Sequence, residues 1–335
     1  MTFSRRAPLL LALLLASLPA QAAVIKFATL APDGTDAMKV LRDIDDEVQK
    51  KTGGELKFKF YAGGRQGDEK DMVRKIRVGQ LHAGGFTGVG LGEIAPEVRV
   101  LDAPWLFRDT AEVDYVYQAF SKDFETAFEK QGYVLLGWTE VGFINIFSNT
   151  PVRSKEDARK LKAWVWEGDP IAESAWKALG VHPIPLSITD VNTSLQTGLI
   201  DAVYSAPLYA IALQWHEKTK FVNSMAIANA SGAVLVSKRF FQTLPKSQQD
   251  ILLEVSRRRL GTLNDLTRKG NTKAYEVLRT AGLKLTEPAP QQLPDFEEAG
   301  RTARRALVGR LYSKELLDRV EKSLETFRSQ KKKPS

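Results

Sequence analysis

The chain has 335 residues, 43% of them hydrophobic, and it contains no cysteine. That length supports two domains with apolar cores, and the lack of cysteine excludes disulfides, thiolate metal sites, cysteine nucleophiles and a lipid-anchored N-terminal cysteine. The formal net charge is +8, but the basic residues are spread along the chain without the interleaved aromatic residues of a nucleic-acid platform, so no nucleic-acid partner is expected.

The first 22 residues are predicted to be a secretory signal peptide. Arg5 and Arg6 supply a basic start, residues 9–15 an apolar segment, and residues 20–22 a small-x-small cleavage site. The apolar segment is shorter than the ~20 residues that a membrane span requires. The mature protein is therefore expected to begin near Ala23 and to be periplasmic, exported and not lipid-anchored, with a retained N-terminal anchor as the alternative.

Hydrophobic periodicity predicts alternating strands and helices through the first half of the chain. Strands are expected at 24–30, 55–61, 81–86, 133–138 and 143–148, and helices at 37–50, 68–78 and 111–131. An irregular stretch is expected to begin at Ala95-Pro96. The chain is predicted to cross into a second lobe near residues 148–151.

The segment from 161 to 207 predicts strand, helix, strand, helix and strand, which is one parallel α/β unit. Gly180 and Gly198 follow its two helices in the position that a left-handed cap prefers. Further on, residues 208–218 are expected to be helical, and 221–222 and 232–237 are expected to be strands. Residues 246–281 are predicted to form one helix of ~50 Å, or two helices joined at Gly261 or Gly270.

The sequence contains no convincing motif for covalent catalysis, nucleotide binding or metal binding. Residues 90–95 match the dinucleotide fingerprint G-x-G-x-x-A, but Pro96 would remove an amide early in the helix that must follow. His82, His182 and His216 are far apart in sequence and form no metal-binding pair, so each is interpreted as a structural or surface residue. No G-x-S-x-G elbow is present. An enzyme, a cofactor and a metal are therefore not expected.

Aromatic residues near predicted strand ends are the best candidates for a binding site. Trp164 and Trp166 alternate on one strand and so face the same side. Aromatic residues on parallel strands usually belong to the core, yet the carboxyl ends of such strands are also where ligands bind. Residues 164–169 are the first choice for a pocket wall. The predicted substrate-binding residues are Trp164, Trp166, Glu167, Phe86, Phe143, Asn145, Gln196, Tyr204, Ser205 and Trp215.

The order of several short motifs resembles a known family. The motifs are Leu161-Lys162, Leu179-Gly180, Pro183, Pro185, Asp190-Val191, Leu195-Gln196-Thr197-Gly198 and Asp201, preceded by the stretches 63–70 and 101–109. Together they resemble the periplasmic solute receptors of tripartite ATP-independent periplasmic (TRAP) transporters, the C4-dicarboxylate-receptor-like family, over roughly residues 24–285. The resemblance implies a receptor that binds a small molecule in an interlobe cleft and delivers it to membrane permease subunits. Divergent relatives also work with a periplasmic tetratricopeptide-repeat protein, which is a further expected partner.

The resemblance implies an α/β fold of two lobes, each a mixed sheet flanked by helices, with the long helix 246–281 bracing both. Lobe I is expected to comprise residues 23–147 and about 230–260, and lobe II residues 148–229 and about 261–285. C-terminal helices are expected over 286–327, and a disordered tail over 328–335.

The chain departs from the family at the ligand-gripping positions. The resemblance implies an arginine in L-K-x-R and another in G-x-R, where this chain has Trp164 and Ile144. An indole has one donor and no charge, so it cannot replace a bidentate guanidinium. A hydrophobic or amphipathic ligand is therefore expected. The alternatives are a C4-dicarboxylate or other organic acid with a different anchor, such as Lys162, and, from another class, a periplasmic enzyme on the same fold.

Overall fold

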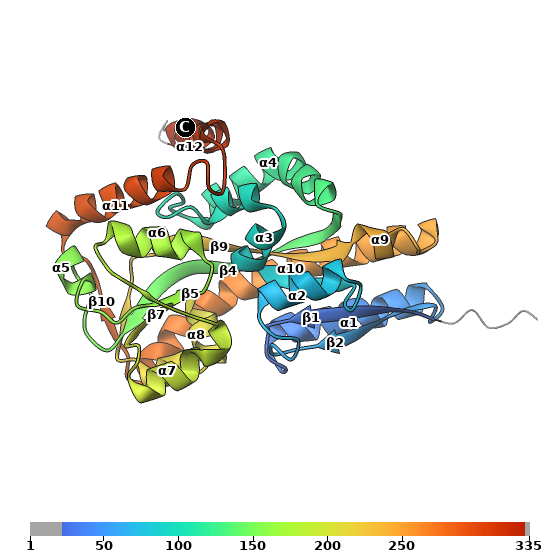
Figure 1. The fold of residues 1–335 in the computed structure, drawn as a ribbon, viewed down its shortest axis with the longest axis horizontal. Helices are drawn as coiled ribbons and strands as arrows, with labels where there is room; N and C mark the ends of the chain where they lie inside the picture. Colours follow the sequence, from blue (N-terminus) through green and yellow to red (C-terminus); the bar gives the residue numbers. More distant parts are fainter. Residues whose placement is uncertain (1–21, 332–335) are drawn as a thin grey trace, which may run out of the picture.

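The computed structural model describes residues 22–331 as two lobes that share one sheet (Figure 1). The strands are β1 (Ala23–Thr29), β2 (Leu56–Tyr61), β3 (Ala83–Thr87), β4 (Tyr133–Ser148), β5 (Trp164–Trp166), β6 (Ile184–Leu186), β7 (Ala202–Ser205), β8 (Phe221–Asn223), β9 (Ala228–Ser237) and β10 (Lys284–Thr286). The α-helices are α1 (Asp36–Lys51), α2 (Glu69–Arg77), α3 (Gly88–Ile94), α4 (Thr110–Lys130), α5 (Lys155–Ala158), α6 (Pro170–Ala178), α7 (Val191–Thr197), α8 (Pro207–Ala212), α9 (Lys238–Phe241), α10 (Lys246–Thr280), α11 (Leu293–Ala306) and α12 (Lys314–Lys331). Short 3-10 helices are η1 (Pro96–Asp102), η2 (Ile188–Asp190), η3 (Trp215–Lys218) and η4 (Pro290–Gln292).

Strand β4 carries the chain from one lobe to the other. The sheet order is β10-β8-β4-β9-β3-β1-β2, and β7 also pairs with β4. The part of β4 from Tyr133 to Ile144 pairs with β9, and the part from Asn145 to Ser148 pairs with β7. The prediction of two separate strands here was wrong, because Gly137 and the positive φ of Gly142 are accommodated as register irregularities within one strand. One continuous strand thus pairs with β9 up to Ile144 and with β7 beyond it.

The segment predicted as a parallel α/β unit forms most of the second lobe. Strands β5 and β6 pair in parallel, and a bridge between Ala163 and Ala202 links them to β7. The last strand, β7, runs antiparallel to β4. Helix α7 ends at Gly198, which has a φ of 72° as the predicted left-handed cap requires. The periodicity therefore predicted the elements correctly, while the lobe completes its sheet with an antiparallel strand.

Helix α10 is continuous over 35 residues and packs against both lobes. Its first half lies along α1, where Arg259 pairs with Glu47 at 2.8 Å. In its second half, the hydroxyl of Tyr275 donates to Oδ1 of Asn145 at 3.0 Å, and Leu278 belongs to the core of the second lobe. The helix passes behind β4 from one lobe to the other (Figure 1). The predicted long bracing helix is confirmed.

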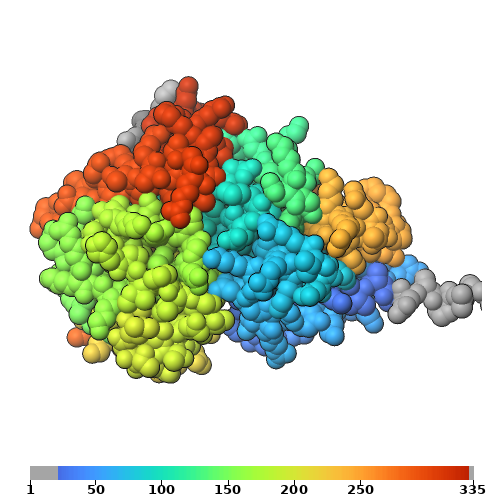
Figure 2. All heavy atoms as spheres, viewed as in Figure 1, coloured from blue at the N-terminus to red at the C-terminus, as the bar shows by residue number. Residues whose placement is uncertain are grey.

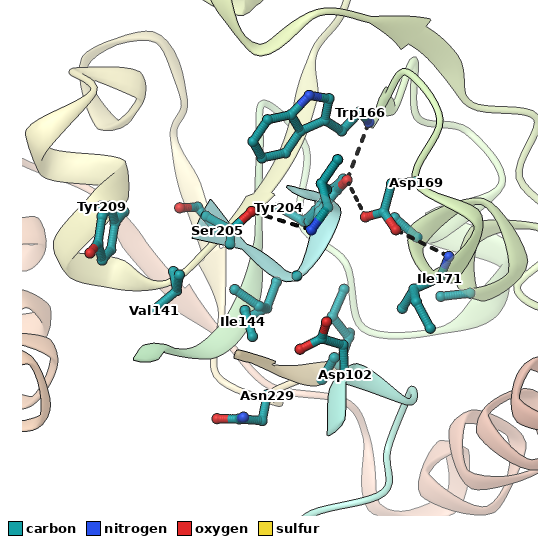
Figure 3. Close-up of a pocket in the computed structure, with 18 of the residues that line it drawn as sticks. Asp102, Val141, Ile144, Trp166, Asp169, Ile171, Tyr204, Ser205, Tyr209 and Asn229 are labelled. Carbon is teal, nitrogen blue, oxygen red and sulfur yellow. Dashed lines mark hydrogen bonds between the residues drawn. The ribbon is translucent and has the colours of Figure 1, made fainter. Parts of the chain in front are cut away.

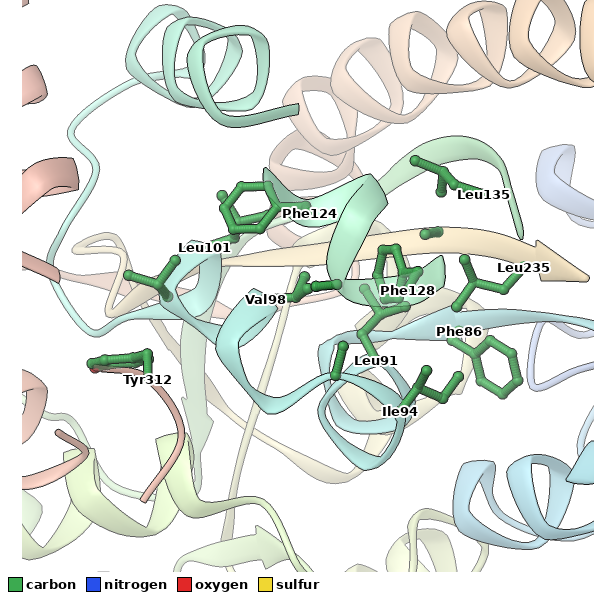
Figure 4. Close-up of a cluster of buried hydrophobic side chains, with 14 of the residues drawn as sticks. Phe86, Leu91, Ile94, Val98, Leu101, Phe124, Phe128, Leu135, Leu235 and Tyr312 are labelled. Atoms are coloured by element: carbon green, nitrogen blue, oxygen red, sulfur yellow. The ribbon is translucent and has the colours of Figure 1, made fainter. Parts of the chain in front are cut away.

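The core of the first lobe fills the space between the sheet and helices α3 and α4 (Figure 4). Phe86, Leu91, Phe124 and Phe128 meet there, and Tyr312 from the C-terminal segment belongs to the same cluster. Burial of these large side chains, at roughly 1.5–3 kcal/mol each, is the main stabilising contribution to this lobe.

The C-terminal helices lie across the top of both lobes in Figure 1. Ser174 on α6 donates its hydroxyl hydrogen to the carbonyl of Ala303 on α11, and Arg328 on α12 pairs with Glu112 on α4 at 2.7 Å. The disordered tail predicted for 328–335 was therefore wrong for residues 328–331, because this ion pair and the helix hold them. Residues 332–335 and most of the predicted signal peptide lie outside the described residues.

Local sequence rules account for several helix starts. Thr35 caps α1, and Asp68 and Asp71 form a reciprocal capping box on α2. The stretch expected to be irregular after Ala95 instead contains η1, which begins with Pro96 at its first position. No helix within residues 22–331 combines the length and apolar character that crossing a membrane would need. The lobe boundaries remain predictions.

Candidate functional site

A cavity of about 120 Å³ lies between the two lobes, and we call it the central cavity (Figure 3). Figure 2 shows the outer surfaces of the two lobes meeting along a seam. The wall of the central cavity combines β3, α3 and η1 from one side, β5, α6, β7 and α8 from the other, and strands β4 and β9. The lining residues are Thr87, Gly88, Val89, Arg99, Asp102, Pro104, Val141, Ile144, Trp164, Trp166, Asp169, Ile171, Ala172, Ala175, Ile188, Tyr204, Ser205, Tyr209, Leu213, Trp215, Ile227, Ala228, Asn229 and Ala230.

An aromatic wall forms one side of the central cavity. The ring of Trp164 stacks on Tyr204 with centroids 4.8 Å apart and meets Trp215 edge-on at 5.2 Å. Trp166 lies 6.1 Å from Trp164 on the same side of β5, as the alternation along the strand predicted. The indole N–H of Trp164 donates to the carbonyl of Leu186 at 3.0 Å. The wall is therefore held rigidly by the core of the second lobe, and Trp164 is only 1% exposed.

A buried arginine lies opposite, in the wall made by the first lobe. Nε of Arg99 donates to Asp102 at 2.8 Å, and Nη2 donates to Asp169 at 2.8 Å. The side chains of all three residues are at most 6% exposed. Asp169 also accepts from the hydroxyl of Tyr204 at 3.2 Å, and Asp102 accepts from the amide of Ser231 at 2.6 Å. Because Arg99 belongs to η1 and Asp169 to the N-cap of α6, this ion pair joins the two lobes.

The protein brings these charges together through local backbone features. Asp169 caps α6 by accepting from the amide of Ile171, and Pro170 occupies the first helical position. Gly88 lies against Asp102, where a Cβ atom would clash with the carboxylate. Only glycine permits that approach, so the position of the carboxylate depends on Gly88.

Burial and pairing shift the pKa values of this cluster. Burial alone would lower the pKa of Arg99, but the neighbouring carboxylates of Asp169 and Asp102 outweigh it and raise that pKa above its ordinary value. Burial raises the pKa of Asp102 even though Arg99 and the Ser231 amide oppose the shift. Burial, together with the charge of Asp169, raises the pKa of Tyr204 well above its usual range. Arg99 therefore stays charged.

A second set of polar contacts joins the lobes beside the cavity. The indole N–H of Trp166 donates to both carboxylate oxygens of Asp68, at 3.1 and 3.0 Å, and the hydroxyl of Ser187 donates to Asp68 at 2.7 Å. Asp68 caps α2 in the first lobe, whereas its two partners belong to the second. These contacts hold the lobes closed around the cavity.

Asn229 supplies an uncommitted amide in the wall formed by β9 (Figure 3). It is 2% exposed, and its Nδ2 atom has no hydrogen-bond partner among residues 22–331. A buried amide without a partner is costly, at roughly 1–3 kcal/mol. An acceptor on a molecule in the cavity would satisfy it.

A further cavity of about 100 Å³, called here the second cavity, adjoins the central one. Residues common to both walls are Thr87, Val141, Trp166, Ile188, Tyr209 and Leu213. Glu69 belongs to the wall of the second cavity, and its carboxylate accepts from the Thr87 amide at 2.7 Å, the Thr87 hydroxyl at 3.0 Å and the Gly90 amide at 2.6 Å. Gly90 is the first residue of the segment 90–95 that matches the dinucleotide fingerprint. Its amide already donates to Glu69, so it is not available to bind a pyrophosphate.

Stability is expected to depend on pH through Glu69. Burial raises its pKa to about 8, despite its hydrogen bonds. In the unfolded chain Glu69 releases its proton above the ordinary pKa of a glutamate, whereas in the folded state it keeps that proton. The stability contributed by Glu69 is therefore greatest below the ordinary pKa and is lost as the pH rises toward 8. Over this range the folded wild type binds one more proton than the unfolded chain, so its unfolding free energy falls by about 1.4 kcal/mol for each pH unit. Between pH 5 and 8 the wild type should therefore lose a few kcal/mol of unfolding free energy relative to Glu69→Gln. Urea unfolding across this range measures it, and parallel curves for the two proteins would contradict it.

The structure brings together six of the ten residues predicted for the site. Trp164, Trp166, Tyr204, Ser205 and Trp215 line the central cavity, and Phe86 lines the second. Whether they contact a ligand stays a prediction.

The other four residues lie outside both cavity walls. Glu167 and Gln196 are exposed at the surface, and Phe143 packs against the core of the first lobe. Asn145 is buried, where its amide donates to the Asn223 carbonyl at 2.8 Å. The direction of each of these four side chains along its own helix, strand or turn takes it away from both cavity walls.

Lys162 does not reach the central cavity. It is exposed, and its ammonium lies 3.3 Å from the carbonyl of Gly198 at the surface. As an anchor for a carboxylate it was therefore a wrong choice, because it precedes β5 and its ammonium lies at the protein surface.

Arg99, Asp102 and Asn229 were missed by sequence reasoning, whereas Asp169 belongs to the segment 164–169 that was predicted as a pocket wall. The available signal for Arg99 was a charged residue inside the apolar run Val98-Arg99-Val100-Leu101. A charge in such a run is almost never buried without a partner. Its partner Asp169 lies 70 residues away, so no local pattern could identify it. Within residues 22–331 no group of three or more residues of metal-ligating type is gathered.

The chain is similar in sequence to known bacterial binding proteins. The sequence model of bacterial extracellular solute-binding protein, family 7, matches residues 27–308. The chain is 25% identical over 254 residues to the 2,3-diketo-L-gulonate-binding periplasmic protein YiaO of Escherichia coli (strain K12), and the match covers 75% of this chain and 77% of that protein.

Solved structures show the same fold. The sugar acid binding protein DctPAm from Advenella mimigardefordensis, in complex with galactonate, has a TM-score of 0.85 at 20% identity, and the match covers 91% of this chain and 99% of that one. A TRAP periplasmic solute binding protein from Desulfovibrio salexigens with bound orotic acid has a TM-score of 0.83 at 20% identity, covering 90% and 99%. These likenesses confirm the predicted two-lobed α/β fold class.

Proposed function

The chain belongs to bacterial extracellular solute-binding protein family 7, and from that premise we propose that it is the periplasmic receptor of a TRAP transporter for a small organic acid. Family membership confirms the resemblance seen in the sequence and makes the chain a solute receptor and not an enzyme. In the proposed function, the acid enters the central cavity, the lobes close on it, and the closed form delivers it to the membrane permease subunits. A tetratricopeptide-repeat partner remains a prediction.

The proposed ligand class rests on one observation. Among the described residues, Arg99 is the only cationic side chain in the wall of the central cavity. Its Nε and Nη2 atoms donate to aspartates, while Nη1 has no hydrogen-bond partner among residues 22–331. A guanidinium with free N–H donors in a mostly apolar cavity wall is suited to a carboxylate.

Arg99 would thus take the place of the family arginines that Trp164 and Ile144 replace. The three similar proteins above carry the names of acids, namely 2,3-diketo-L-gulonate, galactonate and orotic acid. The sequence had led us to expect a hydrophobic or amphipathic ligand. The names of these proteins give no support to a hydrophobic ligand that lacks an acid group. The aromatic wall around Trp164 and the apolar residues beside Ile144 and Ile171 favour an amphipathic acid, held by its carboxylate at Arg99.

Substituting Arg99→Lys is expected to weaken acid binding by about ten- to a hundredfold, because lysine keeps the charge but loses the planar fork. A thermal-shift screen of sugar acids, dicarboxylates, alkanoates and aryl acids would identify the best ligand, and calorimetric titration would measure its affinity. Arg268→Lys is the matched control, since Arg268 pairs with Glu140 and Asp114 and lies outside the central cavity wall. Stabilisation by neutral apolar compounds alone, or equal affinities for both variants, would rule out the proposal.

A further inference from the structure

We infer that the second cavity is a subsite for the far end of the ligand, so that the acid carries an extended apolar tail such as a medium alkyl chain or an aryl-alkyl group. This inference rests on the proposed function, which places the carboxylate at Arg99 in the central cavity. It adds the length and the chemistry of the part of the ligand that lies away from the carboxylate.

The two cavities are neighbours with a common wall. Trp166, Tyr209 and Leu213 from the second lobe and Thr87 and Val141 contribute to both. In the proposed arrangement, the tail of a ligand held at Arg99 passes between these shared side chains into the second cavity. The polar contacts of Trp166 and Ser187 with Asp68 close the lobes beside this region.

The lining of the second cavity is mostly apolar. Its own wall residues are mainly aliphatic or aromatic and include Leu30, Ala31, Leu41, Phe86, Leu260 and Leu263. Its two acidic residues are already engaged by the protein. Glu69 accepts three hydrogen bonds from Thr87 and Gly90, and Glu140 pairs with Arg268 at 2.7 Å.

Size and polarity together indicate the kind of group that fits. Apolar cavities of about 150 Å³ stay dry and bind benzene, and the central and second cavities measure about 120 and 100 Å³. Each suits a group of roughly ring size or a short alkyl segment. A polyhydroxylated tail would have to give up its hydrogen bonds to water in the second cavity, where the protein offers it few partners.

Gly85 offers a way to fill the second cavity without disturbing the first. It lies on β3 opposite Thr29 and Val234, and all three line the second cavity. A Cβ atom there would meet Thr29 at 3.4 Å and Phe27 at 3.5 Å, which is ordinary contact, so Gly85→Leu should project into the cavity. Gly261→Leu is the matched control, because Gly261 lies exposed on α10 with no atom within 4 Å of its Cβ position.

The experiment measures calorimetric affinities for butyrate, hexanoate, octanoate and decanoate with the full mature protein. In the wild type and in Gly261→Leu, affinity should rise by up to about fourfold per added methylene. In Gly85→Leu the affinity should stop rising at a shorter chain length. The affinity for octanoate should then be at least tenfold weaker than in the wild type, while the affinity for butyrate should change less than about twofold. Ala37→Leu, which fills the same cavity from α1, should act likewise and provides a second test if Gly85→Leu folds poorly.

The outcomes separate this inference from the proposed function. If butyrate binds through Arg99 but longer chains bind no better, or if both filling variants follow the wild-type series, the second cavity is not a subsite and the inference is overturned alone. If the wild type binds no acid at all, the proposed function fails and this inference fails with it.

Discussion

Replacing Arg99 with methionine is expected to lower the free energy of unfolding by about 3–5 kcal/mol, since it leaves two buried carboxylates without their cation. Asp102 and Asp169 are each at most 6% exposed and each lies 2.8 Å from the guanidinium. Neither can recover its hydration while the lobes stay closed. Urea unfolding at neutral pH, compared with the wild type, measures the loss.

The triple variant Arg99→Met, Asp102→Asn, Asp169→Asn provides the control for this prediction. It removes all three charges and keeps an acceptor for the Ser231 amide and a good cap for α6. Most of the lost stability should return, because replacing a buried ion pair by neutral groups is often close to neutral. A triple variant no more stable than Arg99→Met would show that charge compensation is not what Arg99 contributes.

Replacing Trp164 with alanine is expected to cost about 3–5 kcal/mol of stability, as removal of a buried tryptophan usually does. The ring is 1% exposed, packs on Tyr204 and Trp215, and donates to the carbonyl of Leu186. Thermal and urea unfolding check this value. Trp164→Phe retains an aromatic ring and loses mainly the hydrogen bond, so it should cost about 1–2 kcal/mol.

The same variant distinguishes a cavity wall from a core position. Trp164 belongs to the core and also lines the central cavity, so ligand affinity should fall together with stability. Loss of its contact with an apolar part of the ligand should weaken binding by about 1–3 kcal/mol, measured under conditions where the variant is fully folded. Unchanged affinity in folded Trp164→Ala would place the ligand away from the aromatic wall.

Local patterns in the sequence determined the elements of this protein. The cap at Thr35, the acidic start of α2 and the stop at Gly198 each act within one turn of a helix, so the residues that cause them are visible in a short window. The long amphipathic pattern predicted α10, and the alternation of Trp164 and Trp166 predicted a shared face. The order of motifs along the chain indicated the family and its fold.

Only the tertiary structure decided how the site is built. Asp68 and Trp166 are 98 residues apart and Arg99 and Asp169 are 70 apart, yet each pair meets where the lobes close. Strand β4 passes from one lobe to the other, and this fixes which of its side chains face the cavity, so Ile144 lines it while its neighbours Phe143 and Asn145 do not. Periodicity shows that a side chain is buried, but its partner depends on which distant segments pair in the sheet, and no short window of sequence contains that information.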